Sequence, residues 1–219
     1  MKMLIGALIA ATAIGCSNYQ SKSKTHSKSE TPRPLKPLKI DDRPFYTWGG
    51  ETDRIFGGLN ADSYLIRIKV DPKNKWIGGE VEISISSLGP YFETLPIDLI
   101  DRLRVSKVFD QNGYLSFEQK HDKVFVRADL KPFETRSITF AYSGHPLEAD
   151  VPPYHGGVNW DHSKNGKPWV GVSCQLNGPY VWFPSFNDHT QEPQHVTLEI
   201  TYPSDLVGVG PGLKTTEFT

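Results

Sequence analysis

The sequence contains very little cysteine and no excess of either charge. Only Cys16 and Cys174 occur in 219 residues, so a cysteine-rich zinc site is excluded. The 24 basic and 25 acidic side chains give a formal net charge of -1. A chain without a basic field is not expected to bind nucleic acid, and a chain without an acidic excess is not expected to be disordered throughout.

Several catalytic motifs are also missing. None of the seven histidines belongs to a His-Glu-x-x-His sequence, and there is neither a Gly-x-Ser-x-Gly elbow nor a glycine-rich phosphate loop. Histidines in the loops of a β protein are more often solvated or hydrogen-bonded to backbone than bound to metal. The loop histidines in question are His155, His162, His189 and His195. We therefore expect this chain to hold no catalytic residues and no metal ligands.

The N-terminus has the features of an export signal. Lys2 precedes an almost wholly apolar stretch, 3–14, which is too short to span a bilayer comfortably. The sequence then reads Ala13-Ile14-Gly15-Cys16, which resembles a bacterial lipobox. We predict a lipoprotein signal peptide over 1–15 and lipidation of Cys16, with an ordinary cleaved signal peptide as the alternative. Acyl chains on Cys16 would anchor the protein to the periplasmic or outer cell surface of a bacterium.

Residues 16–45 differ in composition from the rest of the chain. Serine, lysine and threonine dominate the first part, and Pro32, Pro34 and Pro37 follow. This stretch has too little apolar surface to offset the entropy of ordering the chain. We predict a solvated tether, flexible at first and stiffer at its prolines, that leads into a domain over 46–219.

From Ala61 onward, apolar residues recur at every second position. Tyr64, Ile66, Ile68 and Val70 alternate with Leu65, Arg67 and Lys69, and a second such run follows a short polar turn at 71–75. This pattern predicts antiparallel hairpins, and no stretch shows helical periodicity. The expected strands are Tyr64–Val70, Val81–Ile85, Leu95–Leu99, Leu103–Phe109, Tyr114–Phe117, Val124–Leu130, Ser137–Tyr142, Trp169–Cys174, Val181–Phe183 and Val196–Tyr202. The sequence therefore predicts an all-β fold.

One segment, 168–188, combines aromatic residues with an isolated amide. The simplest interpretation is a hairpin core that buries Trp169, Trp182 and Phe183, with Cys174 as a small buried apolar residue. Gln175, by contrast, lies at a strand end and can both donate and accept hydrogen bonds. An amide placed in this way can bind an amine and a carbonyl group together.

An ordered series of short motifs resembles the N-terminal β domain of M1-family zinc aminopeptidases (gluzincins), the family of leukotriene A4 hydrolase. The series covers about 60–213. Its members are Tyr64–Asp71, Ile77–Ile83, Leu95–Leu99 with Leu103–Val105, Ile138–Gly144, Gly156–Trp160, Trp169–Gln175, and Trp182–Pro184 with Asp188. The segment 208–212 departs from the family's pattern. The resemblance implies a saddle-like, open β-sandwich.

The resemblance also implies a function. In this family the zinc ligands and the general base lie in a second, catalytic domain, and a glutamine that matches Gln175 contacts the N-terminal residue of the peptide substrate. We therefore expect a substrate-capping domain of an exported aminopeptidase, inactive alone, with zinc bound only in the catalytic domain. The sequence ends at Thr219, before the family's β domain would normally finish.

Two other readings remain open. The chain is alternatively a non-enzymatic surface lipoprotein that binds peptides or a partner, or an inert truncated product. An in-frame His-Glu-x-x-His motif downstream of Thr219 would favour the aminopeptidase. A genuine stop codon there would favour the other two.

Overall fold

A computed structural model of the chain describes residues 2–8, 58–150, 152, 156–175, 177–188 and 191–218. The lipidation predicted at Cys16 and the tether predicted over 16–45 lie outside these residues, and both stay predictions. Within the described part no helix is long and apolar enough to cross a membrane.

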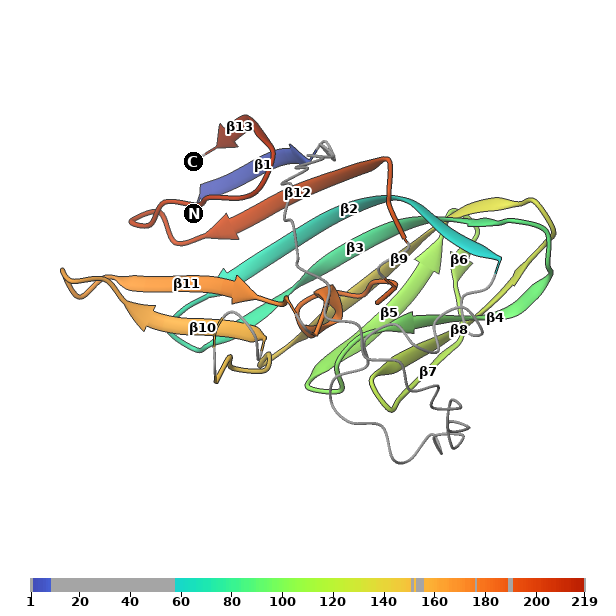
Figure 1. Cartoon of the computed structure of the whole chain (residues 1–219), viewed down its shortest axis with the longest axis horizontal. Helices are drawn as coiled ribbons and strands as arrows, with labels where there is room; N and C mark the ends of the chain where they lie inside the picture. The colour runs from blue at the N-terminus through green and yellow to red at the C-terminus, as the bar shows by residue number, and fades with distance from the viewer. Residues whose placement is uncertain are drawn as a thin grey trace, which may run out of the picture.

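The described residues form strands and one short 3₁₀ helix, η2 (Figure 1). The elements are β1 (Lys2–Leu8), β2 (Leu59–Asp71), β3 (Trp76–Ser87), β4 (Phe92–Asp98), β5 (Leu103–Asp110), β6 (Gly113–Tyr114), β7 (Phe117–Lys120), β8 (Lys123–Leu130), β9 (Thr135–Gly144), β10 (Gly157–His162), β11 (Pro168–Ser173), η2 (Pro179–Val181), β12 (His195–Tyr202) and β13 (Leu213–Phe218). The all-β prediction is confirmed.

Eight strands form one open sheet in the order β13-β1-β12-β2-β3-β9-β5-β6. β12 runs parallel to β2, and every other neighbouring pair in this sheet is antiparallel. The hairpin predicted from the alternation after Ala61 is β2–β3, in which Ile66 pairs with Val81. Tyr64, Ile66 and Ile68 point into the core as the alternation requires.

A second, three-stranded sheet with the order β4-β8-β7 lies at one end of the large sheet (Figure 1). Leu95 and Val124 from this sheet share one apolar cluster with Ile83 and Phe140 from the large sheet, and none of these side chains is solvent-exposed. The two sheets are therefore joined through a common core, and both remain open at their edges, as the predicted open β-sandwich requires. The hairpin β10–β11 projects from the opposite end of the molecule (Figure 1).

The predicted strand over Val181–Phe183 is wrong. Val181 is the last residue of η2, and the Trp182 and Phe183 amides that follow it both donate to the carbonyl of Pro179. The flanking prolines, Pro179 and Pro184, favour a tight turn over a paired strand. Val181 and Phe183 are nevertheless buried in the core cluster that the two sheets share, and the Phe183 ring packs edge-on against Tyr64 of β2.

The predicted strand over Tyr114–Phe117 is divided between the two sheets. Tyr114 belongs to β6 in the large sheet, whereas Phe117 begins β7 in the small one. The chain crosses at this point, since the Leu115 amide donates to Val108 and the carbonyl of Ser116 accepts from Arg127. Each partner lies in a different sheet, and a sequence pattern confined to the segment cannot show this.

The N-terminal residues of the predicted signal peptide form a strand in this structure. β1 pairs with β12 from Lys2 to Leu8 and also pairs with β13 on its other side. The removal of 1–15 during export stays a prediction. If it occurs, β12 and β13 lose the strand that lies between them.

Candidate functional site

Gln175 lies two residues beyond the end of β11, where the β10–β11 hairpin returns to the body of the domain. Its side chain is exposed, and no described residue forms a hydrogen bond with it. Both the carbonyl and the amino group of this amide therefore remain available to a ligand.

The turn that carries Gln175 is closed by the backbone. The Gly178 amide donates to the Cys174 carbonyl at 2.8 Å, and this hydrogen bond closes the turn in which Gln175 and Asn177 lie. Gly178 has a φ of +85°, and a Cβ at this position would lie 1.7 Å from Oδ1 of Asn187. Only glycine fits this conformation and this close approach.

Asn177 fixes the same turn from its buried side. Its side chain is 2% exposed, and Oδ1 accepts a 2.7 Å hydrogen bond from the amide of Gly156, just before β10. This bond connects the two ends of the β10–β11 hairpin. The turn below Gln175 is therefore held to the hairpin as well as closed on itself.

Replacing Asn177 with alanine should lower the free energy of unfolding by about 1–3 kcal/mol, because the buried Gly156 amide loses its only acceptor among the described residues. Urea unfolding measures the change, and the Gly156 amide should exchange faster with solvent. Asn165→Ala, at the exposed tip of the same hairpin, is the control. Equal stability for both variants would contradict the role given to Asn177.

Two buried tyrosines tie the following segment to the core. The Tyr142 hydroxyl on β9 donates to the Trp182 carbonyl at 2.9 Å, and the Tyr64 hydroxyl on β2 accepts from the Phe186 amide at 3.2 Å. Burial raises the pKa of both tyrosines, so both hydroxyls stay protonated. Tertiary hydrogen bonds thus place the segment 177–188.

A buried ion pair also holds the segment 177–188 against the core. Asp98, at the end of β4, contacts Nζ of Lys123 at the start of β8, and its other oxygen accepts a 3.0 Å hydrogen bond from the Asn187 amide. Backbone hydrogen bonds also join Asp98 and Ser185 in both directions. One signal in the sequence could have indicated this pair, a charged residue at the end of one apolar run and another at the start of a later one.

Cys174, beside Gln175, shows no sign of an activated thiol. Its side chain is partly buried against the core, and burial raises the pKa of the thiol. A raised pKa disfavours the thiolate, which is the nucleophilic form. Cys174 therefore acts as a small apolar residue, as expected.

The described residues contain no group of three His, Cys, Asp or Glu side chains that could hold a metal ion. His162 ends β10 and His195 begins β12, so these two histidines lie in different sheets. His155 and His189 lie outside the described residues.

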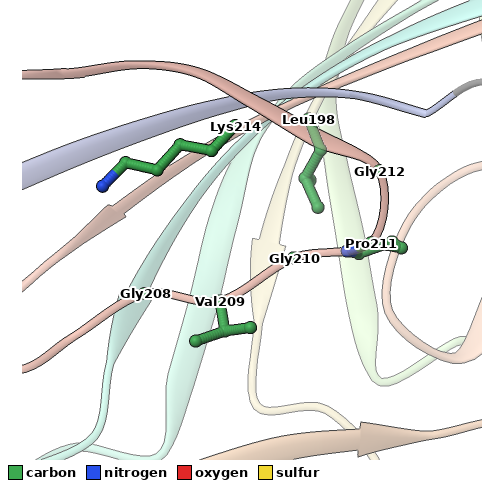
Figure 2. A pocket seen from close by; sticks show the side chains of 7 residues that line it. All are labelled: Leu198, Gly208, Val209, Gly210, Pro211, Gly212 and Lys214. Carbon is green, nitrogen blue, oxygen red and sulfur yellow. The ribbon is translucent and has the colours of Figure 1, made fainter.

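A small hollow of about 180 Å³ lies at the connection between β12 and β13, away from Gln175. Figure 2 shows its wall, in which the glycine-rich segment 208–212 passes Leu198 while the Lys214 side chain extends away from Pro211. Lys214 is the one charged lining residue, and it is paired with Glu217. Nothing in this hollow supports catalysis.

The comparisons with known proteins agree on the fold. No protein-family model and no curated protein sequence matches the chain. The structure does match a two-domain M1 zinc metallopeptidase bound to L-arginine, with a TM-score of 0.56 and 22% identity over 68% of this chain and 33% of that one. It also matches leukotriene A4 hydrolase from Saccharomyces cerevisiae, with a TM-score of 0.51 and 15% identity over 72% of this chain and 25% of that one.

This chain thus corresponds to only a quarter to a third of the length of these enzymes. The described part of the chain has the fold of the N-terminal β domain of M1 zinc metallopeptidases.

Proposed function

We propose that this domain caps the active-site cleft of an M1-type zinc aminopeptidase and that Gln175 binds the N-terminal residue of the peptide substrate. The observation that supports the proposal is the state of the Gln175 side chain, which is exposed and forms no hydrogen bond with a described residue, on a turn held by the Gly178–Cys174 and Gly156–Asn177 hydrogen bonds. A fixed backbone with a free amide presents a donor and an acceptor to a ligand at low entropic cost.

The peptide bond would be cleaved elsewhere. The described residues do not fit a zinc ion, so under this proposal the metal and its general base belong to a separate catalytic domain, and the chain alone is inactive. What this chain supplies is binding. The Gln175 carbonyl oxygen accepts from the substrate's α-ammonium group, and its amino group donates to a carbonyl oxygen.

The proposal includes export. Lipid on Cys16 would hold the domain at the membrane surface, and residues 17–45 would separate it from the bilayer. The enzyme would then act on peptides outside the cytoplasm.

Replacing Gln175 with alanine should lower kcat/KM for an aminoacyl-nitroanilide by about 10- to 100-fold, since a hydrogen bond to a charged group is worth about 1.5–3 kcal/mol. The measurement uses a chimera in which this chain replaces the β domain of a two-domain M1 zinc metallopeptidase. Only a chimera that binds zinc and turns over substrate is suitable.

Two controls accompany this measurement. Gln111→Ala changes another exposed glutamine, in the β5–β6 turn, and should leave kcat/KM unchanged. The chain alone, with zinc added, should release no more nitroaniline than a metal-free sample. Unchanged kinetics for Gln175→Ala in an active chimera would contradict the role of Gln175, and turnover by the chain alone would contradict its inactivity.

One observation favours the alternative of a non-enzymatic binding lipoprotein. Removal of 1–15 from a lipoprotein would take away β1 and leave β12 as an edge strand of the large sheet, and an exposed edge can accept an added strand from a peptide. Peptide binding by the chain without 1–15 that is abolished by a proline in β12 but not by Gln175→Ala would support this alternative.

A further inference from the structure

A cleft of about 480 Å³ lies at the far end of the β10–β11 hairpin and has no part in the proposed function. Trp160 on β10 and Trp169 on β11 line one wall, while the β2–β3 turn and the segment after β12 line the other. Trp169 is 52% exposed, so the prediction that it is buried in a hairpin core is wrong. An exposed tryptophan beside a cleft of this size is typical of a ligand-binding site.

The lining is aromatic and proline-rich, with carboxylates among its residues. Three prolines contribute, Pro72, Pro168 and Pro203, together with the carboxylates Asp71, Asp161 and Asp205. A hydrogen bond from the Asn74 side chain lowers the pKa of Asp71, which therefore stays ionised.

The lining also contains basic groups. Lys75 forms an ion pair with Glu148 at 2.9 Å, which compensates its charge. The other basic residues of the lining are Lys73 and His162, and they face three carboxylates. The excess of negative charge in the lining favours a cationic ligand. Aromatic grooves of this kind bind proline-rich segments in polyproline II conformation, and acidic neighbours select basic residues in them.

The chain contains such a segment in the predicted tether. A polyproline II helix has three residues per turn, so positions three apart share a face. In that conformation Arg33, Lys36 and Lys39 would share one basic face of residues 32–39. The other two faces would be apolar, one made by Pro32, Leu35 and Leu38 and the other by Pro34 and Pro37. This division matches an apolar cleft with carboxylates in its lining.

The segment can reach the cleft. Residues 40–57 lie between it and Gly58 and can extend to at most about 60 Å at 3.3 Å per residue. β2 begins next to Gly58 and carries the chain to Asp71 at the cleft, over about 43 Å at 3.3 Å per residue. The connecting residues can therefore run back along the full length of β2.

We propose that residues 32–39 of this chain dock as a polyproline II helix into the cleft that Trp160 and Trp169 line on one side and the β2–β3 turn and the segment after β12 line on the other. Docking shortens the free tether and fixes which end of the domain faces the membrane anchor. This proposal does not depend on the function of Gln175.

The test is ¹⁹F NMR of the full chain labelled with 5-fluorotryptophan. In a variant with Pro32, Pro34 and Pro37 changed to glycine, the Trp160 and Trp169 resonances should shift from their wild-type positions. A synthetic peptide of residues 31–40 should return them in the variant and should not affect the wild type. Trp182 lies in the turn after η2 and is the internal control.

Three results would overturn the proposal. The first is identical Trp160 and Trp169 resonances in the wild type and the variant. The second is equal restoration by a scrambled peptide whose basic residues are no longer three apart, which would indicate charge alone. The third is a dependence of the wild-type resonances on chain concentration, which would indicate the tether of a second copy.

Discussion

Replacing Asp98 with alanine should lower the free energy of unfolding by about 3–5 kcal/mol, because the change breaks a buried ion pair by removing the carboxylate in contact with the Lys123 ammonium. The Asn187 amide would lose its acceptor as well. The segment 177–188 should become more mobile along with the global loss. Urea unfolding and amide hydrogen exchange measure these two effects.

Two further variants test whether the Asp98–Lys123 pair is buried, unlike an ion pair on the surface. Glu93→Ala removes an exposed pair with Arg127 and should cost no more than about 1 kcal/mol. The double change Asp98→Leu with Lys123→Met removes both buried charges and should be far less destabilising than Asp98→Ala. A loss below about 1 kcal/mol for Asp98→Ala would show that the pair is not buried in solution.

Replacing Phe140 with alanine should cost about 3–5 kcal/mol, since it deletes the largest fully buried side chain and leaves a cavity. Phe140 lies on β9, paired with Val81 on one side and Val108 on the other, and it packs in the cluster that joins the two sheets. The loss should therefore affect both sheets in a single transition. Thermal unfolding followed by circular dichroism measures it.

Phe133→Ala is the control for Phe140→Ala, because it removes the same side chain at the surface. Its side chain is 80% exposed in the β8–β9 turn, so Phe133→Ala should change stability by less than about 0.5 kcal/mol. Comparable losses at Phe133 and Phe140 would contradict the arrangement of the core.

The fold was predictable where the sheet buries one face of a strand. The alternation through Tyr64, Ile66 and Ile68 reports directly which side chains face the core, and β2 and β3 follow it. β10 and β13 escaped prediction because their residues alternate poorly. Glycine and polar residues in β10, and threonines with charges in β13, are placed by their partner strands rather than by their own pattern.

The site was predictable only in part. The resemblance indicated Gln175, and the structure places it at the end of β11 with a free side chain. The resemblance did not indicate Asn177, whose partner Gly156 lies 21 residues away in the chain. It also did not indicate the ion pair of Asp98 and Lys123, which are 25 residues apart. Such contacts exist only after the sheets have assembled. The aromatic run at Trp182 misled the prediction because its side chains pack on the core as those of a strand would, whereas its backbone forms a turn.

The central claim is that Gln175 faces the N-terminus of a bound peptide. A crystal structure of the active chimera with a tripeptide bound tests it most directly. We expect the Gln175 side-chain oxygen to lie about 2.7–3.2 Å from the peptide's α-amino nitrogen. A bound peptide whose α-amino group is held entirely by the catalytic domain, with Gln175 still exposed to solvent, would contradict the claim.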